Sequence, residues 1–88
     1  MIRRRVLVSG LVQGVFFRDT CRRVAGQQQV AGWVRNLPDG RVEAVFEGDP
    51  DRVERMIAWA RHGPAHARVT SVTVEEQPVA GLTGFTIG

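Results

Sequence analysis

VSGLVQGVFFR, residues 8–18, is the stretch that decides the fold of this chain. It begins as an apolar strand, continues as a loop with Gly10 and Gly14, and ends where Arg18 and Asp19 open a helix. Glycine allows a tight turn and a close approach of backbone to a ligand. The first amides of a helix have no partner inside the helix and carry positive partial charge. The stretch therefore predicts a site for a small phosphorylated compound, with the guanidinium of Arg18 at its rim.

Strand-like and helix-like patterns alternate along the rest of the chain. Alternating apolar residues predict strands over residues 3–9, 30–37, 41–47, 67–75 and 83–87. Apolar residues at helical spacing predict one helix over residues 18–29 and a second from Asp49-Pro50-Asp51 to Arg61. Between residues 37 and 41, Pro38-Asp39-Gly40 is typical of a hairpin turn. In the strand that follows, Glu43 and Glu47 alternate with apolar residues, which predicts a sheet with one solvated face.

The order of these elements is β-α-β-β-α-β with a short C-terminal strand. This order predicts the α+β class and a ferredoxin-like split βαβ sandwich, with two helices on one face of an antiparallel sheet. Eighty-eight residues suit one domain, so we expect a single domain over residues 1–88.

A second informative stretch is GWVRNLPDGRVEAVFEG, residues 32–48. Together with the first stretch it resembles the signatures of the acylphosphatase family. The matching positions are Gly10, Val12-Gln13-Gly14-Val15 and Phe17-Arg18 in the first stretch, and Gly32-Trp33-Val34-Arg35-Asn36, Gly40, Val42 and Gly48 in the second. Chain length and element order agree as well, so the resemblance covers essentially the whole chain.

The resemblance implies hydrolysis of the carboxyl–phosphate mixed anhydride of an acyl phosphate, giving a carboxylate and inorganic phosphate. The leaving carboxylate belongs to an acid with a pKa of about 4, so it needs no general acid. A phosphate cradle, an arginine and one polar side chain could then suffice, and we expect neither a metal nor a cofactor.

Arg18 and Asn36 are the expected catalytic residues. The family's catalytic arginine falls on Arg18, whose planar fork can hold two phosphate oxygens. Asn36 ends a strand, and its amide can accept from a water and donate to a phosphate oxygen. Without the resemblance, Arg18 would be read as a surface arginine and Asn36 as a turn residue before Leu37-Pro38.

The substrate-binding cradle is expected to comprise Gln13, Gly14, Val15, Phe16, Phe17 and Arg18, mainly through backbone amides. The side chain of Gln13 could touch the ligand or cap the loop. Cys21 lies on the apolar stripe of its helix, so we expect a buried structural thiol. Trp59 is expected to pack in the core, and Trp33 to lie on the open face of the sheet. A catalytic role for His62 or His66 is the minority interpretation.

Composition limits the kinds of partner. The net charge is +3, from 12 basic residues that are all arginine and 9 acidic residues, which favours small anions without demanding nucleic acid. The single cysteine excludes an internal disulfide and favours a reduced, cytoplasmic location. No stretch of the sequence predicts a membrane segment. We expect a monomer, because both helical stripes can be used inside one domain.

Two other functions remain in view. RNA-recognition domains share this topology but need aromatic residues on the central strands, where this chain offers one. The arginine runs at residues 3–5 and 22–23 are expected to be solvated faces, with a nucleic-acid patch as the alternative. A phosphate-binding domain without turnover is the third possibility. The presence of both Arg18 and Asn36 argues against it.

Overall fold

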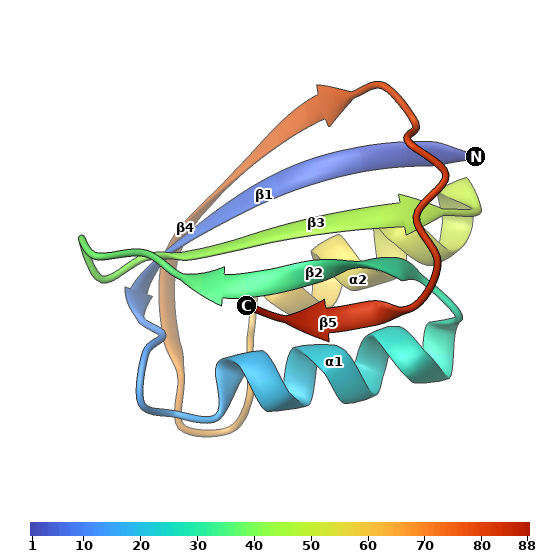
Figure 1. The fold of residues 1–88 in the computed structure, drawn as a ribbon. Helices are drawn as coiled ribbons and strands as arrows, with labels where there is room; N and C mark the ends of the chain where they lie inside the picture. Colours follow the sequence, from blue (N-terminus) through green and yellow to red (C-terminus); the bar gives the residue numbers. More distant parts are fainter.

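The computed structural model describes residues 1–88 and contains five strands and two helices (Figure 1). In chain order they are β1 (Ile2–Leu11), α1 (Phe17–Gln28), β2 (Ala31–Asn36), β3 (Val42–Gly48), α2 (Pro50–Ala60), β4 (Arg68–Gln77) and β5 (Phe85–Ile87). Every element predicted from the sequence is present, with ends that differ by a few residues. The ferredoxin-like arrangement is thereby confirmed.

The five strands form one sheet in the order β4-β1-β3-β2-β5, and both helices cover the same face (Figure 1). All neighbouring pairs are antiparallel except β2 and β5, which are parallel. The sheet is therefore mixed rather than wholly antiparallel. The reason is the path of residues 78–84, which leave β4 at one edge of the sheet and cross its end to the other edge. The chain consequently enters β5 running in the same direction as β2 (Figure 1).

The apolar core lies between the helices and the sheet. Helix α1 buries Phe17, Cys21 and Ala25, and α2 buries Val53, Met56, Ile57 and Ala60. The strands contribute Val6, Val8, Val34, Val42, Ala44 and Phe46. Burial raises the pKa of the Cys21 thiol, which fits the expected structural role. Trp59 packs against this core as expected.

The start of α2 follows the sequence pattern closely. Asp49 is the N-cap, and its carboxylate accepts a hydrogen bond from the Asp51 amide at 3.1 Å. Pro50 occupies the first helical position, where its missing N–H costs nothing. Capping of this kind contributes about 1 kcal/mol.

The open face of β3 is not solvated, which corrects the sequence prediction. Glu43 is 3% exposed and Glu47 is fully buried. The Glu43 carboxylate accepts hydrogen bonds from Arg5 Nε on β1 at 2.6 Å and from Arg35 Nε on β2 at 2.5 Å. Arginine side chains from both neighbouring strands thus lie over the central strand and exclude water. Alternation along one strand does not reveal this cover, because the cover comes from other strands.

Glu47 is held from a different direction. Its carboxylate accepts hydrogen bonds from the amides of Ala80 at 2.8 Å and Leu82 at 2.6 Å, and Arg3 Nη1 lies 3.7 Å from it. The segment 78–84 is thereby fastened over the end of β3 before it delivers β5 to the edge. The segment is also tied to β2, because the Gly32 amide donates to the Gly84 carbonyl at 2.9 Å.

The arginine run at residues 3–5 is also not a free solvated face. The side chains of Arg3, Arg4 and Arg5 are 17%, 20% and 29% exposed, and each lies within 4.0 Å of a carboxylate oxygen. Trp33 lies outside the core, as predicted, and the Arg35 guanidinium stacks over its ring at 5.3 Å.

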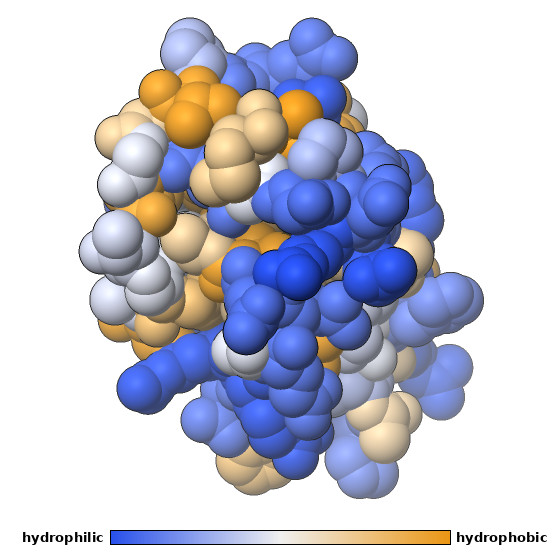
Figure 2. Space-filling view, turned by 90° about the vertical axis from the view of Figure 1, so that its right-hand side faces the viewer, coloured by the Kyte–Doolittle hydropathy of each residue, from blue (hydrophilic) through white to orange (hydrophobic).

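The end of the molecule that carries the N-terminus and residues 78–84 presents mainly hydrophilic side chains, with apolar patches toward one side (Figure 2). At this end the two helices are joined by hydrogen bonds from Arg52 to Gln29 at 2.8 Å and from Arg55 to Gln28 at 3.4 Å. The loop between β1 and α1 lies at the opposite end (Figure 1).

Candidate active site

The loop between β1 and α1, residues 12–16, forms a cradle, and its course is set by a bulge in β1. The pairing of β1 with β4 shifts register between Ser9 and Gly10. Gly10 has φ +124°, and a Cβ there would lie 2.0 Å from the Arg68 carbonyl oxygen. Only glycine allows the two strands to stay this close while β1 turns into the cradle.

The cradle backbone twice adopts left-handed angles, at Gly14 (φ +76°) and at Phe16 (φ +62°). At Gly14 the left-handed angle carries no steric penalty, because glycine has no Cβ. Phe16 is the N-cap of α1 and supplies no side-chain hydrogen bond to the helix. None of the twelve backbone hydrogen bonds outside the regular elements is donated by an amide of residues 12–19. A cradle of free amides at a helix N-terminus is suited to an anion.

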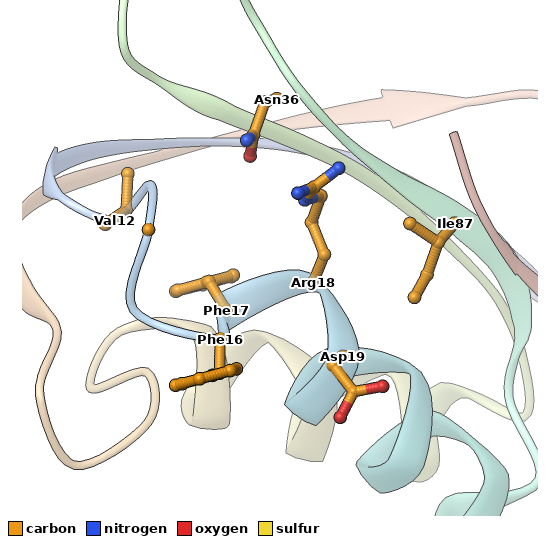
Figure 3. A pocket seen from close by; sticks show the side chains of 8 residues that line it. Val12, Phe16, Phe17, Arg18, Asp19, Asn36 and Ile87 are labelled. Atoms are coloured by element: carbon orange, nitrogen blue, oxygen red, sulfur yellow. The ribbon is translucent and has the colours of Figure 1, made fainter.

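Arg18 and Asn36 come together at this cradle (Figure 3). Arg18 lies in the first turn of α1, and its guanidinium extends toward Asn36, the last residue of β2. No carboxylate pairs with Arg18. The Oδ1 atom of Asn36 is buried and has no hydrogen-bond partner. An unsatisfied buried carbonyl costs about 1–3 kcal/mol, so its place beside a free guanidinium indicates a ligand site.

The cleft at this point has a volume of about 320 Å³. Its lining consists of Val12, Gly14, Phe16, Phe17, Arg18, Asp19, Asn36 and Ile87. Five of the residues expected from the sequence are among them. Val12, Asp19 and Ile87 were not expected as site residues. Ile87 reaches the cleft only because β5 joins the sheet beside β2, and nothing local in its sequence indicates that.

Two expected cradle residues, Gln13 and Val15, do not line the cleft. The side-chain amide of Gln13 instead donates to the carbonyls of Leu37 at 2.7 Å and Arg41 at 3.0 Å. It therefore ties the cradle to the turn between β2 and β3, which fits the capping alternative. Val15 packs against the core.

Phe17 anchors the start of α1. Its ring lies 5.1 Å from that of Trp59 on α2, and it is almost fully buried. Gly63 lies against the same ring, since a Cβ there would come within 2.9 Å of Phe17 Cε2. This packing fixes the helix turn that carries Arg18.

The histidines stand apart from the cleft. Neither His62 nor His66 lines it, and both are exposed. The chain has no group of three or more His, Cys, Asp or Glu side chains that could hold a metal ion. The donors at the site are guanidinium and amide groups, which suit an anion.

Comparison with known proteins identifies the family of this chain. The family model described as acylphosphatase matches residues 4–87. The chain belongs to the acylphosphatase family. An acylphosphatase of Rubrobacter xylanophilus is 61% identical over 86 residues, covering 97% of this chain and 78% of the relative.

Acylphosphatases of solved structure show the same fold. The Bacillus subtilis acylphosphatase superposes with a TM-score of 0.96 at 35% identity, covering 100% of this chain and 99% of that one. For the Coxiella burnetii acylphosphatase the TM-score is 0.95 at 40% identity, with coverage of 99% and 92%. The expectations of an acylphosphatase and of a hydrolase are confirmed at the level of the family.

Neither helix of this chain has the length and apolarity required to cross a membrane.

Proposed function

We propose that the chain hydrolyses acyl phosphates by direct attack of water on a phosphoryl group held in the cradle. One observation carries the proposal: the buried, unpartnered Oδ1 of Asn36 lies beside the unpaired guanidinium of Arg18. The free amides of residues 12–19 supply further donors at the same place. Such an arrangement stabilises charge on a phosphoryl group and orients a water molecule beside it.

Arg18 and the cradle amides bind the phosphoryl oxygens. A guanidinium offers two parallel N–H groups to two oxygens, and its charge is permanent. The amides are held by the backbone geometry of Gly14 and Phe16, so they need no reorganisation when substrate binds.

Asn36 orients the attacking water. Its Oδ1 accepts one hydrogen bond from the water, which directs a lone pair at phosphorus, while its Nδ2 is free to donate to a phosphoryl oxygen. The new P–O bond forms as the bond to the carboxylate oxygen breaks, and the electron pair leaves with the carboxylate. The proton of the water passes to a phosphoryl oxygen. The products are a carboxylate and inorganic phosphate.

The reaction proposed here needs no metal or other cofactor, because charge stabilisation comes from Arg18 and the amides. It acts on a small molecule rather than on nucleic acid. The open face of the central strands β1 and β3 carries no aromatic residue, and its arginines are paired with Glu43 and Glu47. A monomer is supported by the use of both apolar helix faces inside the fold.

The test is hydrolysis of benzoyl phosphate, followed by ultraviolet absorbance in the presence of a chelator. Arg18→Gln, Arg18→Lys and Asn36→Ala are compared with wild type, and Arg23→Gln is the control because Arg23 is exposed on α1 and has no partner. Loss of one preorganised donor should lower kcat by about 10²–10³. The control should retain wild-type activity. A folded wild-type protein that binds phosphate but shows no turnover would overturn the proposal.

A further inference from the structure

The cleft is wider than a phosphoryl group needs, and its chemistry differs from one part to another. Arg18 and Asn36 face each other in one part (Figure 3). Phe16, Asp19 and Ile87 lie around Arg18, farther from Asn36 (Figure 3). Once the phosphoryl group occupies the first part, the leaving acyl group must extend toward the second.

Phe16 is an unusual residue for its position. Its side chain is 77% exposed although it is a large apolar group, and its backbone is left-handed, which is unfavourable for a bulky residue. A glycine or asparagine would serve the turn with less strain and less exposed apolar surface. Backbone strain with an exposed ring at the mouth of a cleft points to a role for the ring itself.

Ile87 adds a second apolar group from another element. It is 37% exposed at the end of β5, and the parallel pairing of β5 with β2 places it at the cleft. The mouth therefore offers apolar contacts from two elements, the cradle and the C-terminal strand.

Asp19 is the only charged side chain of the lining besides Arg18. It is exposed and takes part in no hydrogen bond or ion pair within the chain. With Arg18 occupied by the phosphoryl group, a second anionic group on the acyl side would meet the uncompensated charge of Asp19.

We propose that Phe16, Ile87 and Asp19 form an acyl-binding rim that selects acyl phosphates whose acyl group is apolar and carries no second negative charge. The proposal rests on the function proposed above and deepens it. The apolar side chains of Phe16 and Ile87 contact the acyl group, and the Asp19 carboxylate repels substrates such as carboxylated acyl phosphates.

The apolar part of the proposal is tested with two substrates, benzoyl phosphate and acetyl phosphate. Phe16→Ala should lower the ratio of kcat/KM for benzoyl phosphate to kcat/KM for acetyl phosphate by roughly tenfold, because benzoyl phosphate loses an aromatic contact that acetyl phosphate largely lacks. Phe16→Leu should lower this ratio by a smaller amount. The inhibition constant of inorganic phosphate should stay unchanged, because phosphate has no acyl group. Val74→Ala is the matched control: Val74 is 40% exposed and lies on β4, away from the cleft.

The charge part is tested with benzoyl phosphate and 3-carboxybenzoyl phosphate, which differ by one carboxylate. Asp19→Asn should raise the relative kcat/KM of the carboxylated substrate by roughly fivefold at low salt, and less at high salt. The ratio of benzoyl to acetyl phosphate should not change in this variant.

The outcomes separate this proposal from the one it rests on. A wild-type protein that hydrolyses none of these substrates would refute the proposed function. If wild type is active but Phe16→Ala lowers kcat/KM equally for benzoyl and acetyl phosphate, the rim makes no apolar contact with the acyl group and the inference is wrong. If Asp19→Asn leaves the ratio of kcat/KM for 3-carboxybenzoyl phosphate to kcat/KM for benzoyl phosphate unchanged, the proposed charge selection is wrong.

Discussion

The side chain of Gln13 donates to the carbonyl oxygen of Leu37, the residue directly after Asn36, at 2.7 Å. This hydrogen bond joins the cradle to the strand end that carries Asn36, so it fixes the two halves of the site relative to each other. We expect Gln13→Ala to lower kcat by about tenfold while the protein remains folded, because a small displacement of Asn36 misaligns the water. The KM for benzoyl phosphate should change little. Gln27→Ala, an exposed position on α1 without a hydrogen bond, is the control.

Removal of Asn36 should cost activity but not stability. Its buried Oδ1 has no partner, so Asn36→Ala removes a desolvation penalty together with the side chain. We expect a free energy of unfolding in urea equal to wild type or up to about 1 kcal/mol higher. A loss of more than about 2 kcal/mol would show that the side chain serves the fold rather than the reaction.

Stability should fall in acid because of the two buried glutamates. Burial alone raises the pKa of Glu43, but hydrogen bonds from Arg35 and Arg5 outweigh it and the net pKa is lowered. The hydrogen bond from the Ala80 amide lowers the pKa of Glu47, against the effect of burial and with help from Leu82 and Arg3. Both carboxylates therefore stabilise the fold above the ordinary glutamate pKa, and this contribution is lost as pH falls through the lowered values.

Glu47→Gln should flatten this acid dependence of unfolding, measured by urea denaturation between neutral pH and the acid region. It should also reduce stability at pH 7, because the side-chain NH2 would face one of the two donating amides of Ala80 and Leu82, and that amide would lose its acceptor. Glu54→Gln is the matched control, since Glu54 is exposed on α2 and has no ion pair. A parallel loss of stability in both variants would speak against the role assigned to Glu47.

Replacement of Gly10 and of Gly26 by alanine should change the stability of the fold in opposite directions. Gly10→Ala places a Cβ 2.0 Å from the Arg68 carbonyl oxygen at a left-handed angle, and we expect a loss of about 2–4 kcal/mol. Gly26 lies within α1 with nothing within 4 Å of its Cβ position, so Gly26→Ala should add up to about 1 kcal/mol. Thermal unfolding of the two variants measures both effects. A tolerated Gly10→Ala would mean that the bulge can relax.

Cys21 should be unreactive in the folded protein. It is fully buried and burial raises the pKa of its thiol, so little thiolate is present at neutral pH. A thiol reagent should modify it only after unfolding, and Cys21→Ala should retain activity. Rapid modification of the native protein, or loss of activity in a folded variant, would contradict the structural role.

Much of the fold could be predicted because the relevant signals are local. Helix α2 has its cap, its proline and its apolar stripe within one stretch, and the turn between β2 and β3 has Pro38 and Gly40. The prediction of a solvated open face was wrong because the cover over Glu43 and Glu47 depends on partners that lie between 8 positions (Arg35 to Glu43) and 44 positions (Arg3 to Glu47) away in the sequence. The parallel placement of β5 likewise depends on the route of a connecting segment, which no periodicity encodes.

The residues of the site also fall into two groups, those predicted by a local motif and those placed by tertiary contacts. Gly14, Arg18 and Asn36 are carried by motifs of fixed spacing, and the structure brings them to one cleft. Ile87 and the hydrogen bonds of Gln13 arise from tertiary contacts and could not be read from a motif. The roles of these residues in catalysis stay predictions until the variants are measured.

The two faces of the sheet should respond differently to heat. One face is stabilised by apolar contacts with the helices, whereas the other buries Glu43 and Glu47 among arginines and amides. The hydration of charged groups becomes less favourable as temperature rises, so the cost of keeping those carboxylates dry decreases on heating. The ionic layer over β3 therefore holds the sheet, and with it the strand that carries Asn36, more effectively at high temperature than a count of exposed ion pairs would suggest.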